Sequence, residues 1–157
     1  VFSLEGINPL VIGGHWIPEM LQVAGGAQEL YPPGCPAARI QWQEVQEYAP
    51  EKLYIDLCSS DLERHMREIS WLAKQDGWYD LPAVQSGEVY LIDHVYFSRP
   101  GPRVVQGLEI LAQLTHPEIF SGYIPANAVA KLEASQLVGS SPEQLPEFFR
   151  PFEGADG

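Results

Sequence analysis

Residues 93–103 read DHVYFSRPGPR and lie between two apolar segments. The run before them, Val89-Tyr90-Leu91-Ile92, is short, and an amphipathic run begins after them at Val104. This order predicts a strand, a loop and then a helix. Pro102 suits the first helical turn, where its missing N–H costs no hydrogen bond, and Gly101 suits the turn before it. The stretch therefore places a helix N-terminus directly behind the end of a strand.

The loop at 93–103 carries groups that suit a flat and partly anionic ligand. It offers free helix N–H groups, the guanidinium groups of Arg99 and Arg103, and the rings of Tyr96 and Phe97. In α/β domains, ligands bind at the loops that follow the strands. The alternative interpretation is that both rings belong to the core and that both arginines pair with surface carboxylates.

The composition is that of a globular domain. The chain has 157 residues, of which 45% are hydrophobic and 19% are charged, and this length is enough for one hydrophobic core. No apolar run approaches the roughly 20 residues that span a bilayer. The 21 acidic and 9 basic residues give a net charge of -12, which nucleic-acid phosphates and anionic membranes would repel. We therefore expect no nucleic-acid partner.

Neither the cysteines nor the N-terminus shows the pattern of a secreted precursor. Cys35 and Cys58 form no C-x-x-C motif and no disulfide framework, and we do not expect them to pair. The chain opens on VFSL, which already resembles a strand, and shows no signal-peptide pattern. We expect a processed or excised piece, or a chain whose upstream part is absent.

Strands and helices alternate along the chain. Strands are expected at 1–4, 52–57 and 89–92, and helices at about 15–24, 42–48, 60–76 and 102–114. Residues 6–14 are expected to form a loop with a packed apolar centre, and Ser60 with Glu63 forms a predicted capping box. Right-handed crossovers between the strands then predict an α/β fold: a single three-layer α/β/α lobe with a mostly parallel sheet.

Three regions are expected along the chain. Residues 1–120 form the predicted ligand-binding lobe, and 121–138 an additional helical segment with its helix at 128–137. Residues 139–157 are rich in Pro, Glu and Gly, so we expect a flexible or loosely docked tail. Its predicted anchors are Leu145, Phe148, Phe149 and Phe152.

The sequence shows no enzyme signature. Metal-ligand spacing is found for none of the four histidines, His15, His65, His94 and His116. The G-x-S-x-G elbow, the P-loop and the dinucleotide fingerprint are absent, and Ser98 or Cys58 would need a base that the sequence does not supply. His15, His94 and Cys58 all follow predicted strands. Two interpretations are therefore open: the three side chains form a site for a soft metal ion, or each is held separately by hydrogen bonds.

Several unusual loop motifs occur in the order seen in one known family. They are VFSLEGINPL at 1–10, GHWIPEM at 14–20, AGG at 24–26, QWQEV at 41–45 with AP at 49–50, LPAVQSGEVY at 81–90 and YFSRPGPR at 96–103. Together they resemble the C-terminal lobe of cobalamin (vitamin B12)-binding substrate-binding proteins of ABC transporters, of the helical-backbone, class III periplasmic type. The resemblance runs from residue 1 to about Phe120.

In that family a corrinoid lies in the cleft between two α/β lobes, which one long helix joins. The resemblance implies that this chain is one lobe, with a missing second lobe and an ABC transporter permease as partners. The implied ligand-binding residues are Gly14, His15, Trp16, Cys58, Ser59, Tyr96, Phe97, Arg99 and Arg103. No catalytic residue and no required cofactor are implied. His15 or His94 is an alternative ligand to the cobalt. The family's transporter-docking glutamate should fall near Gln43, so Glu44 is the predicted docking carboxylate.

We therefore predict non-enzymatic binding of cobalamin or of a related corrinoid or metal chelate. The alternatives are a stand-alone corrinoid sensor or carrier, an enzyme that uses Cys58 or Ser98, and a lobe whose exposed aromatic face forms a homodimer. Haem or an iron chelate would also suit aromatic loops. The resemblance indicates a periplasmic or membrane-associated protein, and the cytoplasm is the alternative for a chain without a leader.

Overall fold

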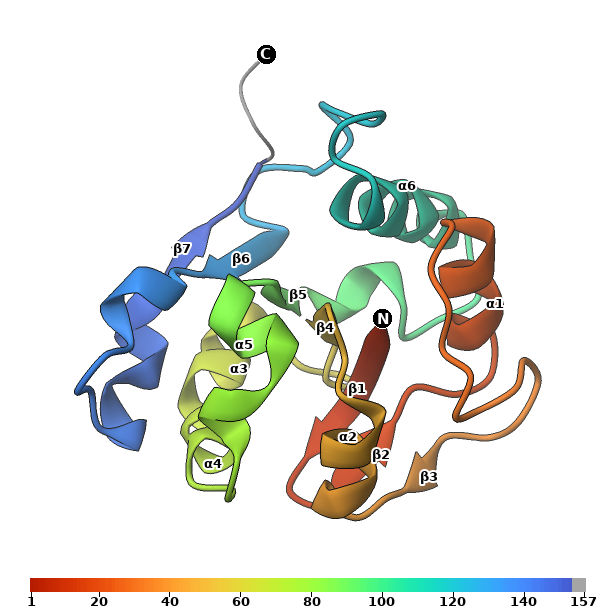
Figure 1. Ribbon diagram of the computed structural model, residues 1–157. Helices are drawn as coiled ribbons and strands as arrows, with labels where there is room; N and C mark the ends of the chain where they lie inside the picture. The colour runs from red at the N-terminus through yellow and green to blue at the C-terminus, as the bar shows by residue number, and fades with distance from the viewer. Residues whose placement is uncertain (154–157) are drawn as a thin grey trace.

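One mixed sheet forms the centre of the computed structural model, which describes residues 1–153. In this part of the chain the strand order is β3-β2-β1-β4-β5-β6-β7. The strands are β1 (Phe2–Ile7), β2 (Leu10–Ile12), β3 (Ala38–Arg39), β4 (Leu53–Ile55), β5 (Val89–Ile92), β6 (Val129–Leu132) and β7 (Phe149–Pro151). Helices cover both of its faces (Figure 1).

The sheet is parallel only at its centre. β1 pairs with β4, and β4 with β5, in parallel, whereas β2, β3, β6 and β7 join antiparallel at the two edges. The α/β class is confirmed, but the expected mostly parallel sheet is wrong for the edges. The segment Leu10-Val11-Ile12 is a strand rather than a packed loop. Because only Asn8 and Pro9 separate it from β1, the two strands can pair only as an antiparallel hairpin.

Helices lie on both sides of the sheet, as the three-layer prediction requires. On one face lie α1 (Ile17–Val23) and α6 (Arg103–Thr115), and on the other lie α2 (Trp42–Tyr48), α3 (Leu62–Glu68), α4 (Ser70–Ala73) and α5 (Pro82–Ser86). Within β4, Leu53 and Ile55 pack toward α2–α5, and Tyr54 packs toward α1 and α6. Since successive side chains of a strand point to opposite faces, the central strands are apolar throughout.

The N-terminus of α3 differs from the prediction in its capping residue. Asp61, not Ser60, caps the helix: its Oδ1 accepts a hydrogen bond from the Arg64 backbone N–H at 2.9 Å. Asp61 has the extended backbone of an N-cap residue, whereas the Ser60 N–H already donates to the carbonyl oxygen of Leu57. The neighbouring helix α2 has the predicted bounds, and Glu44 Oε2 accepts from the Gln41 N–H at 2.7 Å in its capping box.

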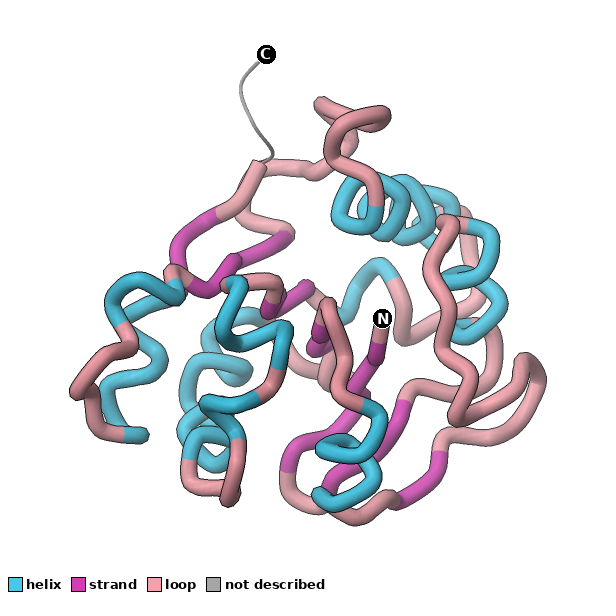
Figure 2. The backbone as a smooth tube through the Cα atoms, viewed as in Figure 1, coloured by secondary structure: helices cyan, strands magenta, loops and turns pink. Residues whose placement is uncertain are grey.

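The C-terminal region belongs to the sheet. The expected helix at 128–137 is wrong, because Val129–Leu132 form β6, which pairs with β5, and β7 pairs with β6 in turn (Figure 2). Ala, Lys, Leu and Glu favour helices, but pairing with the open edge of β5 outweighs this preference. Leu145 is fully buried and Phe149 is 5% exposed. Residues 142–151 are therefore packed rather than loose, and 154–157 lie outside the described residues.

Candidate functional site

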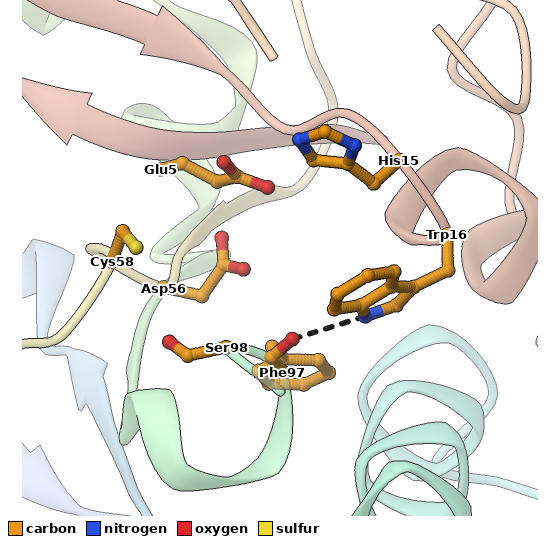
Figure 3. Close-up of a pocket in the computed structure, with 7 residues that line it drawn as sticks. All are labelled: Glu5, His15, Trp16, Asp56, Cys58, Phe97 and Ser98. Carbon is orange, nitrogen blue, oxygen red and sulfur yellow. Dashed lines mark hydrogen bonds between the residues drawn. The ribbon is translucent and has the colours of Figure 1, made fainter. Parts of the chain in front are cut away.

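A cavity of about 260 Å³ opens where β1, β4 and β5 reach their carboxyl ends (Figure 3). Glu5 lies in β1, Asp56 and Cys58 follow β4, and Phe97 and Ser98 follow β5. Ligands of α/β sheets bind outside the carboxyl ends of the parallel strands. The lining residues are Glu5, His15, Trp16, Asp56, Cys58, Phe97 and Ser98.

The loop before α1 is held tightly at the edge of this cavity. The backbone N–H of Gly14 donates to Glu5 Oε1 at 3.2 Å, and a Cβ on Gly14 would overlap the backbone nitrogen of Ala37. His15 has a positive φ of 56°, a conformation that is uncommon for residues other than glycine. The Trp16 indole N–H donates to the Phe97 carbonyl oxygen at 3.0 Å. The loop is thereby preorganised with the indole at the cavity wall.

Two carboxyl groups form an acidic wall of the cavity. Asp56 is 4% exposed, and the Ser3 hydroxyl donates to its Oδ1 at 2.8 Å. Burial and the neighbouring Glu5 carboxylate raise the pKa of Asp56 well above its usual range, and the Ser3 hydrogen bond opposes this shift. Burial also raises the pKa of Glu5, against the effects of the Gly14 N–H and His15. The cavity therefore favours groups that donate hydrogen bonds to carboxyl oxygens.

A second cavity, of about 450 Å³, adjoins the first and shares Ser98 with it. Its lining residues are Ser59, His94, Val95, Ser98, Arg99, Gly101, Pro102 and Arg103. The Ser59 N–H donates to Ser98 Oγ at 3.4 Å, which ties the loop after β4 to the loop after β5. Ser59 has a positive φ of 57°. Strained backbone of this kind often accompanies functional sites.

The structure brings together most of the residues that the sequence singled out. His15, Trp16, Cys58 and Phe97 line the first cavity, and Ser59, Arg99 and Arg103 line the second. Gly14 borders the first cavity through its hydrogen bond to Glu5. Tyr96 lines neither cavity, because its half-buried ring packs against the core beneath α1 and α6. Phe97 is 4% exposed, so its ring also serves the core.

Sequence reasoning missed the acidic residues of the cavity. Glu5 lies within β1, and Asp56 directly follows the last residue of β4. The available signal was a carboxylate at the end of an otherwise apolar strand, where a charge is costly unless it has a partner. Ser98 was considered only as a nucleophile. Within residues 1–153, neither the Ser98 hydroxyl nor the Cys58 thiol has a hydrogen bond to a histidine.

No cluster of three or more His, Cys, Asp or Glu side chains suited to a metal ion occurs in residues 1–153. His15 lines the first cavity and His94 the second, so the two histidines of the predicted metal site line different cavities. Within the same residues, no helix combines the length and the apolar character that crossing a membrane requires.

No protein-family model matches this chain. Over 47 residues, 30% of this chain and 15% of the relative, it is 40% identical to the uncharacterized ABC transporter substrate-binding lipoprotein YvrC of Bacillus subtilis (strain 168).

Two solved structures share the fold. The TroA-like periplasmic binding protein FepB of Veillonella parvula matches with a TM-score of 0.59 and 18% identity, over 76% of this chain and 39% of that one. The periplasmic vitamin B12 binding protein BtuF of Vibrio cholerae matches with a TM-score of 0.58 and 20% identity, over 72% of this chain and 42% of that one. The chain thus shares its fold with part of each of these two periplasmic binding proteins, and it spans less than half of their length.

Proposed function

We propose that this chain is one lobe of an ABC transporter substrate-binding protein and that its two adjoining cavities bind part of cobalamin or of a related corrinoid or metal chelate. The main support is the position of the site, which lies at the carboxyl ends of the central strands. The likeness of fold to periplasmic binding proteins, BtuF among them, supports the same role. A second lobe would close over the ligand from the opposite side.

The composition of the site favours ligand binding over the alternatives. A self-pairing lobe would present an apolar face, whereas this site exposes carboxyl, imidazole and guanidinium groups. A catalytic Cys58 or Ser98 would need a base within hydrogen-bonding distance, and the residues described offer no histidine in that role. Docking of a permease at Glu44 stays a prediction. That carboxylate lies on α2 and is engaged in the helix cap.

A titration with cyanocobalamin tests the proposed function. Tryptophan fluorescence and the corrin visible bands would be followed for the wild-type chain, for Trp16→Ala and for Trp71→Ala as the matched control. Trp71 packs against the opposite core, beneath α2–α5. We expect saturable quenching that weakens in Trp16→Ala and persists in Trp71→Ala. Equal binding by both variants would place the ligand elsewhere, and no binding by the wild type would contradict the proposal for this chain.

A further inference from the structure

The two adjoining cavities present different polar groups to a ligand. Glu5 and Asp56 line the first, and Arg99 and Arg103 line the second, with Ser98 between them. A ligand that occupies both cavities therefore meets carboxyl oxygens at one end and guanidinium groups at the other. Such an arrangement selects for the charge distribution of the ligand and not only for its size.

The acidic end has unused hydrogen-bonding capacity. Glu5 accepts one backbone N–H, from Gly14, and Asp56 Oδ1 accepts the Ser3 hydroxyl. A carboxylate provides about four lone-pair positions, so each group retains acceptors for a ligand. Because Asp56 is 4% exposed, bulk water does little to stabilise its charge. Amide N–H groups or a cation would be bound here, and an anionic group would be repelled.

The two arginines of the second cavity also retain unused capacity for binding an anion. The chain has a net charge of -12, yet within residues 1–153 no carboxylate forms an ion pair with Arg99 or Arg103. Arg103 is the first residue of α6, a helix of 13 residues, and Arg99 lines the same cavity from the loop before it. The positive end of the helix and two free guanidinium groups act on the same cavity. Ser59 and Ser98 add hydroxyl groups to it. This combination suits a phosphate group.

We propose that the site selects dipolar ligands, with amide or cationic groups against Glu5 and Asp56 and a phosphodiester against Arg99 and Arg103. The inference rests on the proposed function and makes it specific. Among corrinoids, it favours one that carries a nucleotide loop, with its phosphodiester, over one that lacks the loop. It also disfavours polyanionic iron chelates, because their negative charge would face the carboxyl groups.

A comparison of two corrinoid probes tests this selectivity. Cyanocobalamin carries the phosphodiester and dicyanocobinamide does not, and both would be titrated into the wild type and into Arg99→Gln/Arg103→Gln. The control is Arg67→Gln, an exposed arginine of α3 that pairs with Glu63. We expect the wild type and the control to prefer cyanocobalamin by about tenfold, the effect of one charged hydrogen bond. The double variant should lose the preference through weaker cyanocobalamin binding, with dicyanocobinamide binding unchanged.

The outcomes separate this inference from the proposed function. Equal affinity of the wild type for both probes, or equal weakening of both in the double variant, overturns the inference while corrinoid binding stands. If neither corrinoid binds, the proposed function fails. The basic end is then tested alone by NMR of the arginine side chains during titration with inorganic phosphate. Shifts at Arg99 and Arg103 that vanish in the double variant would support the phosphate site, and their absence in the wild type would overturn it.

Discussion

The indole Nε1 of Trp16 and the carbonyl oxygen of Phe97 lie 3.0 Å apart in a hydrogen bond that spans 81 sequence positions. The bond joins the loop before α1 to the loop after β5, and both loops border the first cavity. Because the first loop leads into α1 and the second leads into α6, the bond links the shape of the cavity to the positions of these two helices.

Replacing Trp16 by Phe should therefore lower the stability of the fold. The ring keeps much of its contact area but loses its donor, so we expect the free energy of unfolding to fall by about 1 kcal/mol. Urea denaturation would measure the change, with Trp71→Phe as the control, because no hydrogen bond of the Trp71 indole occurs in residues 1–153. An equal loss in both variants would mean that the Trp16–Phe97 bond contributes nothing.

Asp56→Asn should stabilise the protein at neutral pH. The folded-state pKa of Asp56 is raised by burial and by Glu5, so this carboxyl favours folding when protonated and opposes it as the pH rises through that pKa. The amide cannot ionise and still accepts from Ser3. We expect a gain of about 1 kcal/mol or more in the free energy of unfolding at pH 7, which disappears toward pH 4.

The control for this prediction is Asp76→Asn, at an exposed position. Urea denaturation of both variants across this pH range would measure the effect. A constant gain for Asp56→Asn at every pH would show that ionisation is not its source. Corrinoid binding by the same variant should weaken if Asp56 accepts hydrogen bonds from the ligand.

His65 should make the fold sensitive to mild acid. Burial lowers the pKa of this fully buried histidine from 6.5 to about 4. The unfolded chain therefore binds a proton before the folded chain does, and stability falls as the pH drops from about 6.5 to about 4. The loss is on the order of 3 kcal/mol, the shift converted at 1.36 kcal/mol per unit. In His65→Met this component should be missing, so denaturation curves of equal pH dependence would contradict the assignment.

Leu145→Ala tests whether the C-terminal region is part of the fold. Leu145 is fully buried against the core beneath α2–α5, so truncation should cost about 2–5 kcal/mol of unfolding free energy. Val138→Ala is the matched control, since Val138 is 94% exposed and its truncation should change stability by less than about 0.5 kcal/mol. Similar small effects for both would indicate that residues 142–151 are loosely attached. Thermal or urea unfolding provides the measurement.

Much of the central fold could be predicted because its signals are local. The bounds of α2 and β5 agree with the predictions, since Pro50 ends one and an apolar run between polar residues defines the other. The predictions failed where a segment meets a distant strand edge. Residues 129–132 have helix-forming composition but pair with β5, and no pattern within them shows that this edge is open. Leu10-Val11-Ile12 pairs with β1 across a two-residue turn and with the distant β3, and only the second of these pairings lies beyond the reach of local patterns.

The residues of the site also fall into two groups: those that local sequence patterns reveal and those that only the fold reveals. Arg99 stood out because it follows a strand signal in a loop with unusual composition, and Gly14 and Trp16 were implied by the resemblance of their loop motif; both signals depend only on neighbours in the chain. Glu5 and Asp56 did not stand out, because their importance comes from lining the same cavity, which only the parallel pairing of β1 and β4 brings about. Local patterning is enough to place strands, helices and loops, since it acts over a few residues. Only the pairing of the strands brings the two carboxyl groups to one cavity and places this cavity beside the loop that carries Arg99 and Arg103.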